Sequence, residues 1–146
     1  MSHHPKSILL VALQFLFIVL LLTGTPLDNL SVWPAILIIM SFLLMLWALA
    51  AMQRSKWRIF PEPSAKAILI IHGPYRYIRH PMYSAIILGA AGLLTSYCTW
   101  LRLIMVISLA IVLISKLTWE EKMLSQKFEG YSSYCTHTKR LIPFLF

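Results

Sequence analysis

The chain has 146 residues, of which 59% are hydrophobic and 12% are charged, and its net charge is +8. A soluble domain usually carries about 25% charged residues, so this chain has too few polar groups to cover a surface that faces water. The composition therefore excludes an ordinary soluble enzyme, and it excludes a nucleic-acid-binding domain because no soluble basic face is available; it indicates a protein embedded in a lipid bilayer.

Four apolar segments follow one another along the chain, and each predicts a transmembrane helix, because a helix satisfies its own backbone hydrogen bonds in lipid. The segments cover about residues 8–23, 32–52, 82–96 and 101–118. The first is interrupted by Gln14 and also fits a secretory signal, but no small-x-small cleavage site follows, so we expect a retained helix. The predicted fold class is all-α: a single polytopic membrane domain over residues 1–146, with an interfacial loop and a cytosolic C-terminal tail.

Basic residues are concentrated in the loop between the second and third segments and in the C-terminal tail. Ten of them define this bias: Arg54, Lys56, Arg58, Lys66, Arg76, Arg79, Lys122, Lys127, Lys139 and Arg140. The loop at residues 23–31, by contrast, has a single charge at Asp28. The positive-inside rule then predicts that both termini and the central loop face the cytoplasm, and we expect a bacterial inner-membrane protein. Cys98 and Cys135 fall at opposite membrane faces, so no disulfide is expected.

The last two apolar segments are close enough in sequence to form a helical hairpin. Its arms rise about 23 Å and 30 Å at 1.5 Å per residue, and both return to the cytoplasmic face. Arg79 and His80, at the start of one arm, should then lie near Glu120 and Glu121 at the end of the other. The polar stretch "HGPYRYIRHPMY" at residues 72–83 would thereby face an acidic helix end.

This juxtaposition suits a zwitterionic ligand with an amino-acid end. Pro81 fits the first position of a helix, where free amides and the helix dipole attract an anion. A carboxylate at Glu120 or Glu121 would bind a cation. Aromatic faces able to stack on a base or contact a sulfonium are offered by Tyr75, Tyr77 and Tyr83. Each group alone also suits a membrane anchor, but anchoring requires neither the Gly-Pro-Tyr turn nor a proline after histidine.

A metal site is the weaker alternative for the histidines. His72, His80 and His137 lack the spacing of a ligand set, and lysines surround them. We therefore expect no metal.

Two blocks of sequence carry a resemblance to a known family. The first, "LIIHGPYRYIRHPMYSAIILGAAG" at residues 69–92, resembles a G-P-Y-R-x-x-R-H-P-x-Y motif followed by an apolar helix. The second, "EEKMLSQKFEGYSSY" at residues 120–134, resembles an E-E-x-x-L motif, and "TKRLIPFLF" resembles the family's closing segment. Over residues 60–146 the chain is similar to the isoprenylcysteine carboxyl methyltransferase and phospholipid N-methyltransferase superfamily of integral membrane enzymes.

The resemblance implies S-adenosylmethionine as methyl donor, bound at the cytoplasmic membrane surface by segments 69–83 and 116–134. Carried over by motif, the residues around this cofactor are Tyr75, His80, Pro81, Met82 and Tyr83, with Leu69 and Ile70 as a backbone wall. Glu120 would hold the ammonium group of the cofactor, and Arg79 would order the loop by charge pairing. The acceptor would be a lipophilic molecule that reaches the site from the bilayer.

Two departures from the family pattern concern the acceptor. Isoprenylcysteine methyltransferases share an arginine, implicated with the substrate, at the position that Lys116 occupies here. Lysine lacks the planar two-point contact that arginine makes with a carboxylate. "FEGY" replaces the usual F-G-x-x-Y. A carboxylate acceptor would need orientation, by Lys116, whereas an amine acceptor would need a base, Glu121 or His80. The acceptor and the oligomeric state stay open, and the alternative is a non-catalytic membrane module that binds a lipid or a partner subunit.

Overall fold

The structure is a computed structural model that describes residues 5–25, 31–53, 68–143 and 145–146. This part of the chain forms five α-helices and one 3-10 helix, η1, and contains no strand. The elements are α1 (Pro5–Thr23), α2 (Val32–Met52), η1 (Gly73–Arg76), α3 (Pro81–Ser96), α4 (Trp100–Lys127) and α5 (Tyr131–His137). The predicted all-α fold class is confirmed. Several residues named above lie outside the described part: Asp28, Arg54, Lys56, Arg58 and Lys66.

Three helices, α1, α2 and α4, are long and apolar enough to cross a membrane, and α3 is a shorter apolar helix of 16 residues. The four helices cover the predicted spans. The predicted fourth span ends at residue 118, and the helix α4 that contains it continues to Lys127. The added residues are mostly good helix formers but polar, so they extend the helix without extending its apolar part. Glu120 and Glu121 consequently lie inside α4, about two turns before its end.

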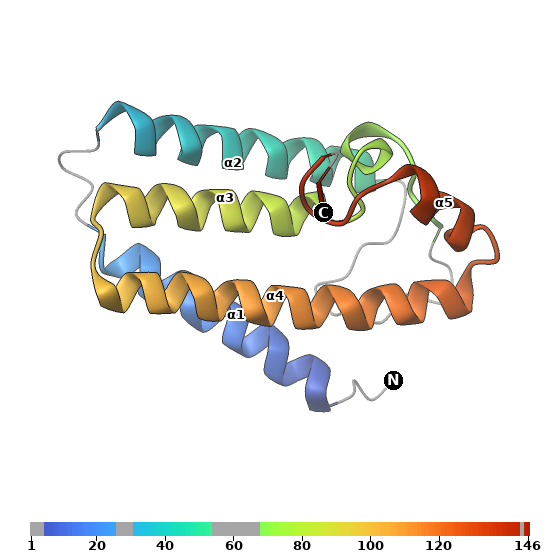
Figure 1. The fold of residues 1–146 in the computed structure, drawn as a ribbon, viewed down its shortest axis with the longest axis horizontal. Coiled ribbons are helices and arrows are strands. Elements are labelled where there is room, and N and C mark those ends of the chain that lie inside the picture. The colour runs from blue at the N-terminus through green and yellow to red at the C-terminus, as the bar shows by residue number, and fades with distance from the viewer. Residues whose placement is uncertain (1–4, 26–30, 54–67, 144) are drawn as a thin grey trace.

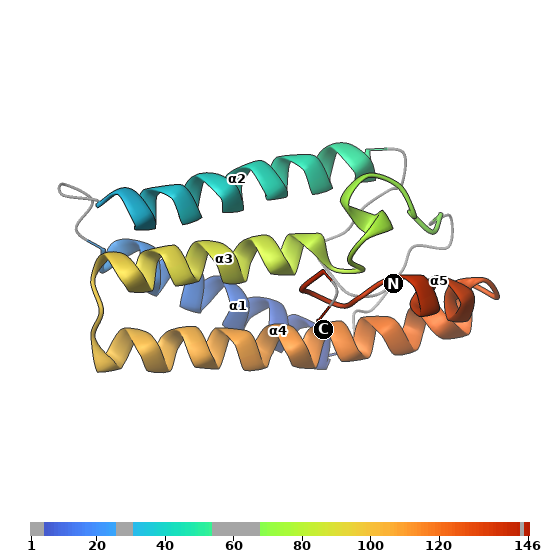
Figure 2. The same cartoon turned by 45° about the horizontal axis from the view of Figure 1, so that its top comes forward.

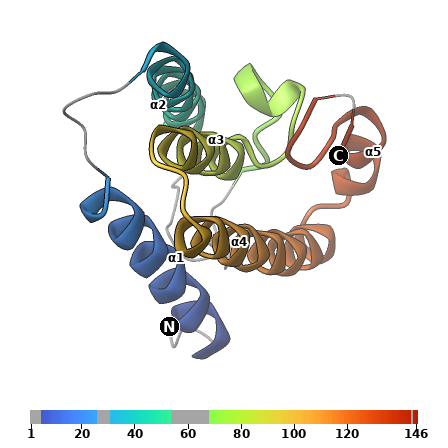
Figure 3. The same ribbon diagram turned by 60° about the vertical axis from the view of Figure 1, so that its left-hand side comes forward.

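The helices are arranged as a layered bundle (Figure 1). α2 packs along α3, α4 lies beside α3 on its other side, and α1 packs against α4. In Figure 2, α2, α3 and α4 run side by side while α1 crosses behind them, and the end-on view of Figure 3 shows α1 inclined to the rest. A short turn, residues 97–99, joins α3 to α4, so the predicted hairpin is present. Its open end carries η1, α5 and the C-terminal tail.

Close packing between α2 and α3 depends on glycines. A Cβ atom on Gly92 would lie 2.9 Å from Ile38 Cγ1 and 3.2 Å from the Pro34 carbonyl oxygen. Two turns earlier in α3, the Ala85 carbonyl oxygen accepts a 2.7 Å hydrogen bond from Ser41 Oγ of α2. Small residues permit such approach, and packing with interhelical hydrogen bonds is what holds helices together in lipid.

We expect Gly92→Val to separate α2 from α3 and to lower the free energy of unfolding by about 1–3 kcal/mol, the usual range for overpacking. Thermal unfolding of the detergent-solubilised protein measures this. Gly130→Ala is the matched control, because a Cβ atom there meets nothing within 4 Å. Equal unfolding temperatures for both variants would contradict the packing argument.

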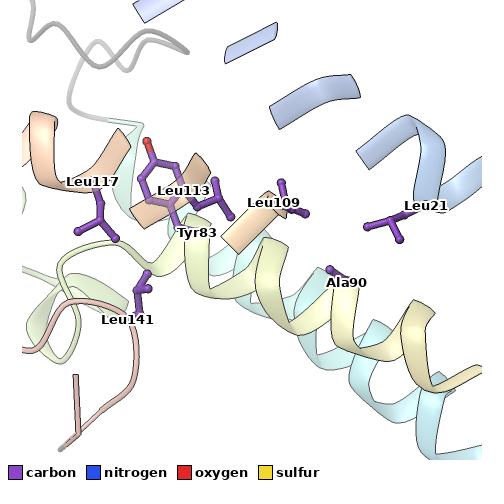
Figure 4. Packing of buried hydrophobic residues seen from close by; sticks show 7 residues of the cluster. All are labelled: Leu21, Tyr83, Ala90, Leu109, Leu113, Leu117 and Leu141. Carbon is purple, nitrogen blue, oxygen red and sulfur yellow. The ribbon is translucent and has the colours of Figure 1, made fainter. Parts of the chain in front are cut away.

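A second core joins α1, α3, α4 and the tail (Figure 4). Its buried members are Leu21, Tyr83, Ala90, Leu109, Leu113, Leu117 and Leu141. Figure 4 shows Tyr83 beside Leu113, with Leu117 and Leu141 at the same end and Leu21 at the other. The cluster therefore ties the membrane helices to the tail at the position of Tyr83.

At the opposite end of the bundle, the buried guanidinium of Arg102 joins three segments. Its Nη1 donates to the Leu93 carbonyl oxygen at 3.1 Å, and its Nη2 donates to Thr25 Oγ1 at 2.7 Å. Tyr97 lies 5.3 Å from the guanidinium. The cation therefore lies near the C-terminal ends of α1 and α3, where helix dipoles favour positive charge.

Candidate functional site

The segment before α3 is shaped by the Gly-Pro-Tyr turn. Gly73 adopts φ of 62°, a left-handed conformation that favours glycine, and a Cβ atom there would lie 3.0 Å from Ala51 Cβ of α2. The turn can therefore lie directly on α2. Tyr75 is buried in a small cluster with Ala48, Ala51 and Ile70. This places the predicted wall residue Ile70 and the tyrosine together.

The C-terminal tail pairs with the same segment through its backbone. Arg79 N–H donates to the Lys139 carbonyl oxygen at 2.7 Å, and His80 N–H donates to the Arg140 carbonyl oxygen at 3.0 Å. Lys139 N–H in turn donates to the Tyr77 carbonyl oxygen at 3.1 Å. One turn into α3, Ser84 Oγ donates to the Leu141 carbonyl oxygen of the tail at 2.6 Å. The tail thus fixes the backbone from which the His80 side chain projects.

Arg79 connects α4 with the tail. Its Nε donates to Glu121 Oε1 at 2.7 Å, and its Nη1 donates to the carbonyl oxygens of Thr138 and Cys135. Arg140 Nε donates to the other Glu121 oxygen at 2.9 Å. Burial lowers the pKa of the Arg79 guanidinium, but the hydrogen bond and charge of Glu121 outweigh this and raise it above the usual value. Arg79 therefore stays a cation that links α4 to the tail.

Glu120 has different surroundings from Glu121. Tyr83 Oη donates to Glu120 Oε1 at 2.5 Å, and His80 Nδ1 lies 3.5 Å from Glu120 Oε2. The rings of His80 and Tyr83 are stacked, with centroids 5.4 Å apart. Glu121 is paired with two guanidiniums, whereas the acidic charge of Glu120 faces a phenol and an imidazole. Of the two carboxylates, Glu120 is better suited to an added ammonium group.

His80 is buried and its two ring nitrogens face the two glutamates. Nε2 lies 3.4 Å from Glu121 Oε1, without the alignment of a hydrogen bond. A buried polar atom that makes no hydrogen bond is uncommon in folded proteins and requires an explanation. The imidazole is thus positioned between the acidic pair and the start of α3.

Lys116 lies one turn before Glu120 and is almost fully buried, with 2% exposure. Its Nζ donates to Gln14 Oε1 of α1 at 2.9 Å and lies 5.2 Å from the centroid of the Tyr83 ring. Lys116, the predicted substrate residue, therefore contacts both α1 and Tyr83, a predicted cofactor residue.

The remaining predicted cofactor residues form the apolar side of this region. Met82 packs against the cluster that contains Ile70 and Tyr75, and Leu69 is half-buried. Burial raises the pKa of the Tyr75 phenol above its usual value, with smaller contributions from Tyr134 and Glu120. The phenol is therefore neutral throughout the ordinary pH range and lies within electrostatic reach of Glu120.

The first turn of α3 offers fewer free amides than the sequence suggested. Pro81 begins the helix as predicted, but the N–H groups of Tyr83 and Ser84 both donate to the His80 carbonyl oxygen. An anion at this helix start would therefore rely more on the helix dipole than on these two amides. Among the described residues, no three His, Cys, Asp or Glu side chains form a group that could hold a metal ion.

Three functional contacts were missed by sequence reasoning: the backbone pairing of the tail, the second guanidinium on Glu121, and the contact of Gln14 with Lys116. Only the contact of Gln14 with Lys116 had a signal in the sequence, because Gln14 is the polar interruption of an apolar run. A buried polar residue in a membrane helix is costly and usually faces a partner.

One comparison with known proteins identifies a family. The family model described as phospholipid methyltransferase matches residues 30–130, which include α2, η1, α3 and α4. No curated protein matches the chain. The matched region contains Glu120, Glu121, His80, Tyr75 and Tyr83.

Proposed function

Because this chain belongs to the phospholipid methyltransferase family and is an integral membrane methyltransferase, we propose that it transfers a methyl group from S-adenosylmethionine to a lipophilic acceptor at the cytoplasmic membrane face. The observation that carries this proposal is the contact of His80 and Tyr83, at the start of α3, with Glu120 on α4. These elements are about forty positions apart in sequence, and packing alone does not require acidic and aromatic groups there.

The residues present fit the chemical groups of this cofactor. Glu120 supplies a carboxylate for the ammonium group, since its charge is not paired with a guanidinium as that of Glu121 is. Tyr75 and Tyr83 supply aromatic faces near that carboxylate, and aromatic faces attract a positively charged sulfonium. Ile70 and Met82 line the apolar side. His80 Nε2 is buried beside Glu121 Oε1, 3.4 Å away, so the imidazole holds a fixed position next to the acidic pair.

When bound, S-adenosylmethionine would supply an electrophilic methyl group. The lone pair of the acceptor would form a bond to the methyl carbon as the bond from that carbon to sulfur breaks, and the electron pair of the broken bond would stay on sulfur. The protein residues are needed mainly to align the reactants and to exclude water. An amine acceptor also loses a proton. Of the two bases predicted, the geometry favours His80, because Glu121 is held by Arg79 and Arg140.

The acceptor is proposed to be a lipid or another hydrophobic small molecule. The exposed surfaces of α1, α2 and α4 are rich in large apolar side chains, so a molecule dissolved in the bilayer can approach laterally. Lys116, one turn before Glu120, is proposed to act on the acceptor side of the site. The positive-inside bias supports cytoplasmic placement of this end.

The test is binding of S-adenosylmethionine to the purified full chain in detergent, followed by transfer of a labelled methyl group into total lipid extract from cells with and without expression. We expect saturable binding and a labelled lipid that depends on expression. Absence of binding to the wild-type protein would reject the proposal. Binding without transfer would favour a non-catalytic membrane module.

A further inference from the structure

Gln14, in the middle of α1, makes a polar contact inside the apolar bundle. Its side chain is buried, with 7% exposure, and its Oε1 accepts a 2.9 Å hydrogen bond from Lys116 Nζ. α1 lies outside the region matched by the family model, which begins at residue 30. The contact therefore joins a helix outside the matched region to a residue inside it.

The contact holds Lys116 in one orientation. A lysine ammonium in hydrocarbon requires polar partners, and a buried charge left without them is strongly unfavourable. The side-chain amide of Gln14 provides such a partner on the α1 side. Removing it would leave the ammonium with its other neighbours, the Tyr83 ring and the charge of Glu120, and Lys116 would shift toward them and away from α1.

Lys116 in turn acts on the residues that face the cofactor. Its Nζ lies 5.2 Å from the Tyr83 ring centroid, a cation–π distance, and Tyr83 Oη donates to Glu120. The Tyr83 side chain is thus held by a cation at its ring and by a carboxylate at its hydroxyl. A displaced Lys116 would alter both the ring position and the electrostatic environment of Glu120, one turn further along α4.

We propose that Gln14 is a positioning residue of the methyltransferase site: through Lys116 it orients Tyr83 and Glu120, so that α1 contributes to donor binding without touching the donor. This inference rests on the proposed function, because it concerns the same site. It makes donor affinity depend on a hydrogen bond located in the membrane-spanning part of the bundle.

The experiment compares four variants of the full chain in detergent by the dissociation constant for S-adenosylmethionine and by the unfolding temperature. They are Gln14→Leu, Gln14→Glu, the double variant Gln14→Leu/Lys116→Met, and Thr25→Val. Thr25→Val is the matched control, because Thr25, two residues after α1, accepts a buried hydrogen bond at its Oγ1 from Arg102 of α4, at the opposite end of the bundle.

We expect Gln14→Leu to weaken donor binding about tenfold, within the range of couplings inside one network. Gln14→Glu keeps an acceptor oxygen for Lys116 and should retain most of the affinity. The double variant replaces both polar partners with apolar groups and should recover the unfolding temperature, but its donor affinity should stay low. Thr25→Val should lower the unfolding temperature and leave donor affinity within about twofold.

Wild-type affinity in Gln14→Leu would overturn the inference. Recovery of affinity together with stability in the double variant would also overturn it, since the pair would then be structural only. If the single variant does not fold, the double variant and Gln14→Glu still decide the outcome. A wild-type protein that binds no donor would instead reject the proposed function, and the inference with it.

Discussion

Replacing Glu120 with glutamine is expected to weaken S-adenosylmethionine binding by about ten- to a hundredfold, the usual range for loss of a charged hydrogen-bond partner. Glutamine has nearly the same shape and keeps an oxygen that accepts from Tyr83, so the fold around α4 should be preserved. What it removes is the negative charge that would balance the ammonium group of the cofactor. Isothermal titration calorimetry in detergent measures the change.

The control for this prediction is Glu129→Gln. Glu129 is an exposed carboxylate that follows α4, so the same change of charge is made away from the site. Its donor affinity should equal that of the wild type. Equal affinities for Glu120→Gln and the wild type would show that the ammonium is held elsewhere.

Arg79→Met is expected to destabilise the protein by about 3 kcal/mol, because it leaves the mostly buried Glu121 with only part of its positive partners. It also removes the donors to the carbonyl oxygens of Cys135 and Thr138, so the tail should detach from α4. Thermal unfolding measures the first effect. Cleavage by trypsin after Lys139, which is slow when that backbone is paired, measures the second.

Two further variants test whether the charge or the shape of the Arg79 guanidinium is responsible for these effects. Arg76→Met removes an exposed arginine of the neighbouring turn and should change neither stability nor cleavage. Arg79→Lys keeps the charge but cannot reproduce the planar set of donors that reaches both Glu121 and the tail, so it should rescue only partly. Full rescue by lysine would mean that charge alone, rather than the geometry of the guanidinium, holds the tail.

The sequence predicted the arrangement of α3 and α4 well because that prediction needed only helix length and direction. Two apolar segments joined by a short turn must be antiparallel neighbours, and the rise per residue then sets which ends meet. The contacts of His80 and Arg79 with the two glutamates follow from this arithmetic. Hydropathy predicted the apolar part of α4 but not the full length of the helix, because hydropathy marks where lipid ends, whereas a helix continues through polar residues that favour it.

Contacts between single polar residues on distant helices were not predictable in the same way. The contact of Gln14 with Lys116, and that of Thr25 with Arg102, depend on the rotation of α1 about its axis. α1 is apolar on nearly all sides, so no periodic pattern indicates which face it buries. The backbone pairing of the tail with residues 77–80 also lacks a sequence signal, since it uses peptide groups that every residue carries.

The pairing of residues 138–141 with the start of α3 also sets an order of biogenesis. These residues leave the ribosome after all four apolar helices, so a nascent chain can insert its helices before the backbone around His80 has its final partner. Synthesis of residues 138–141, and not insertion of the helices, then completes this backbone pairing. The backbone around His80 can therefore take its final conformation only after the helices have been made.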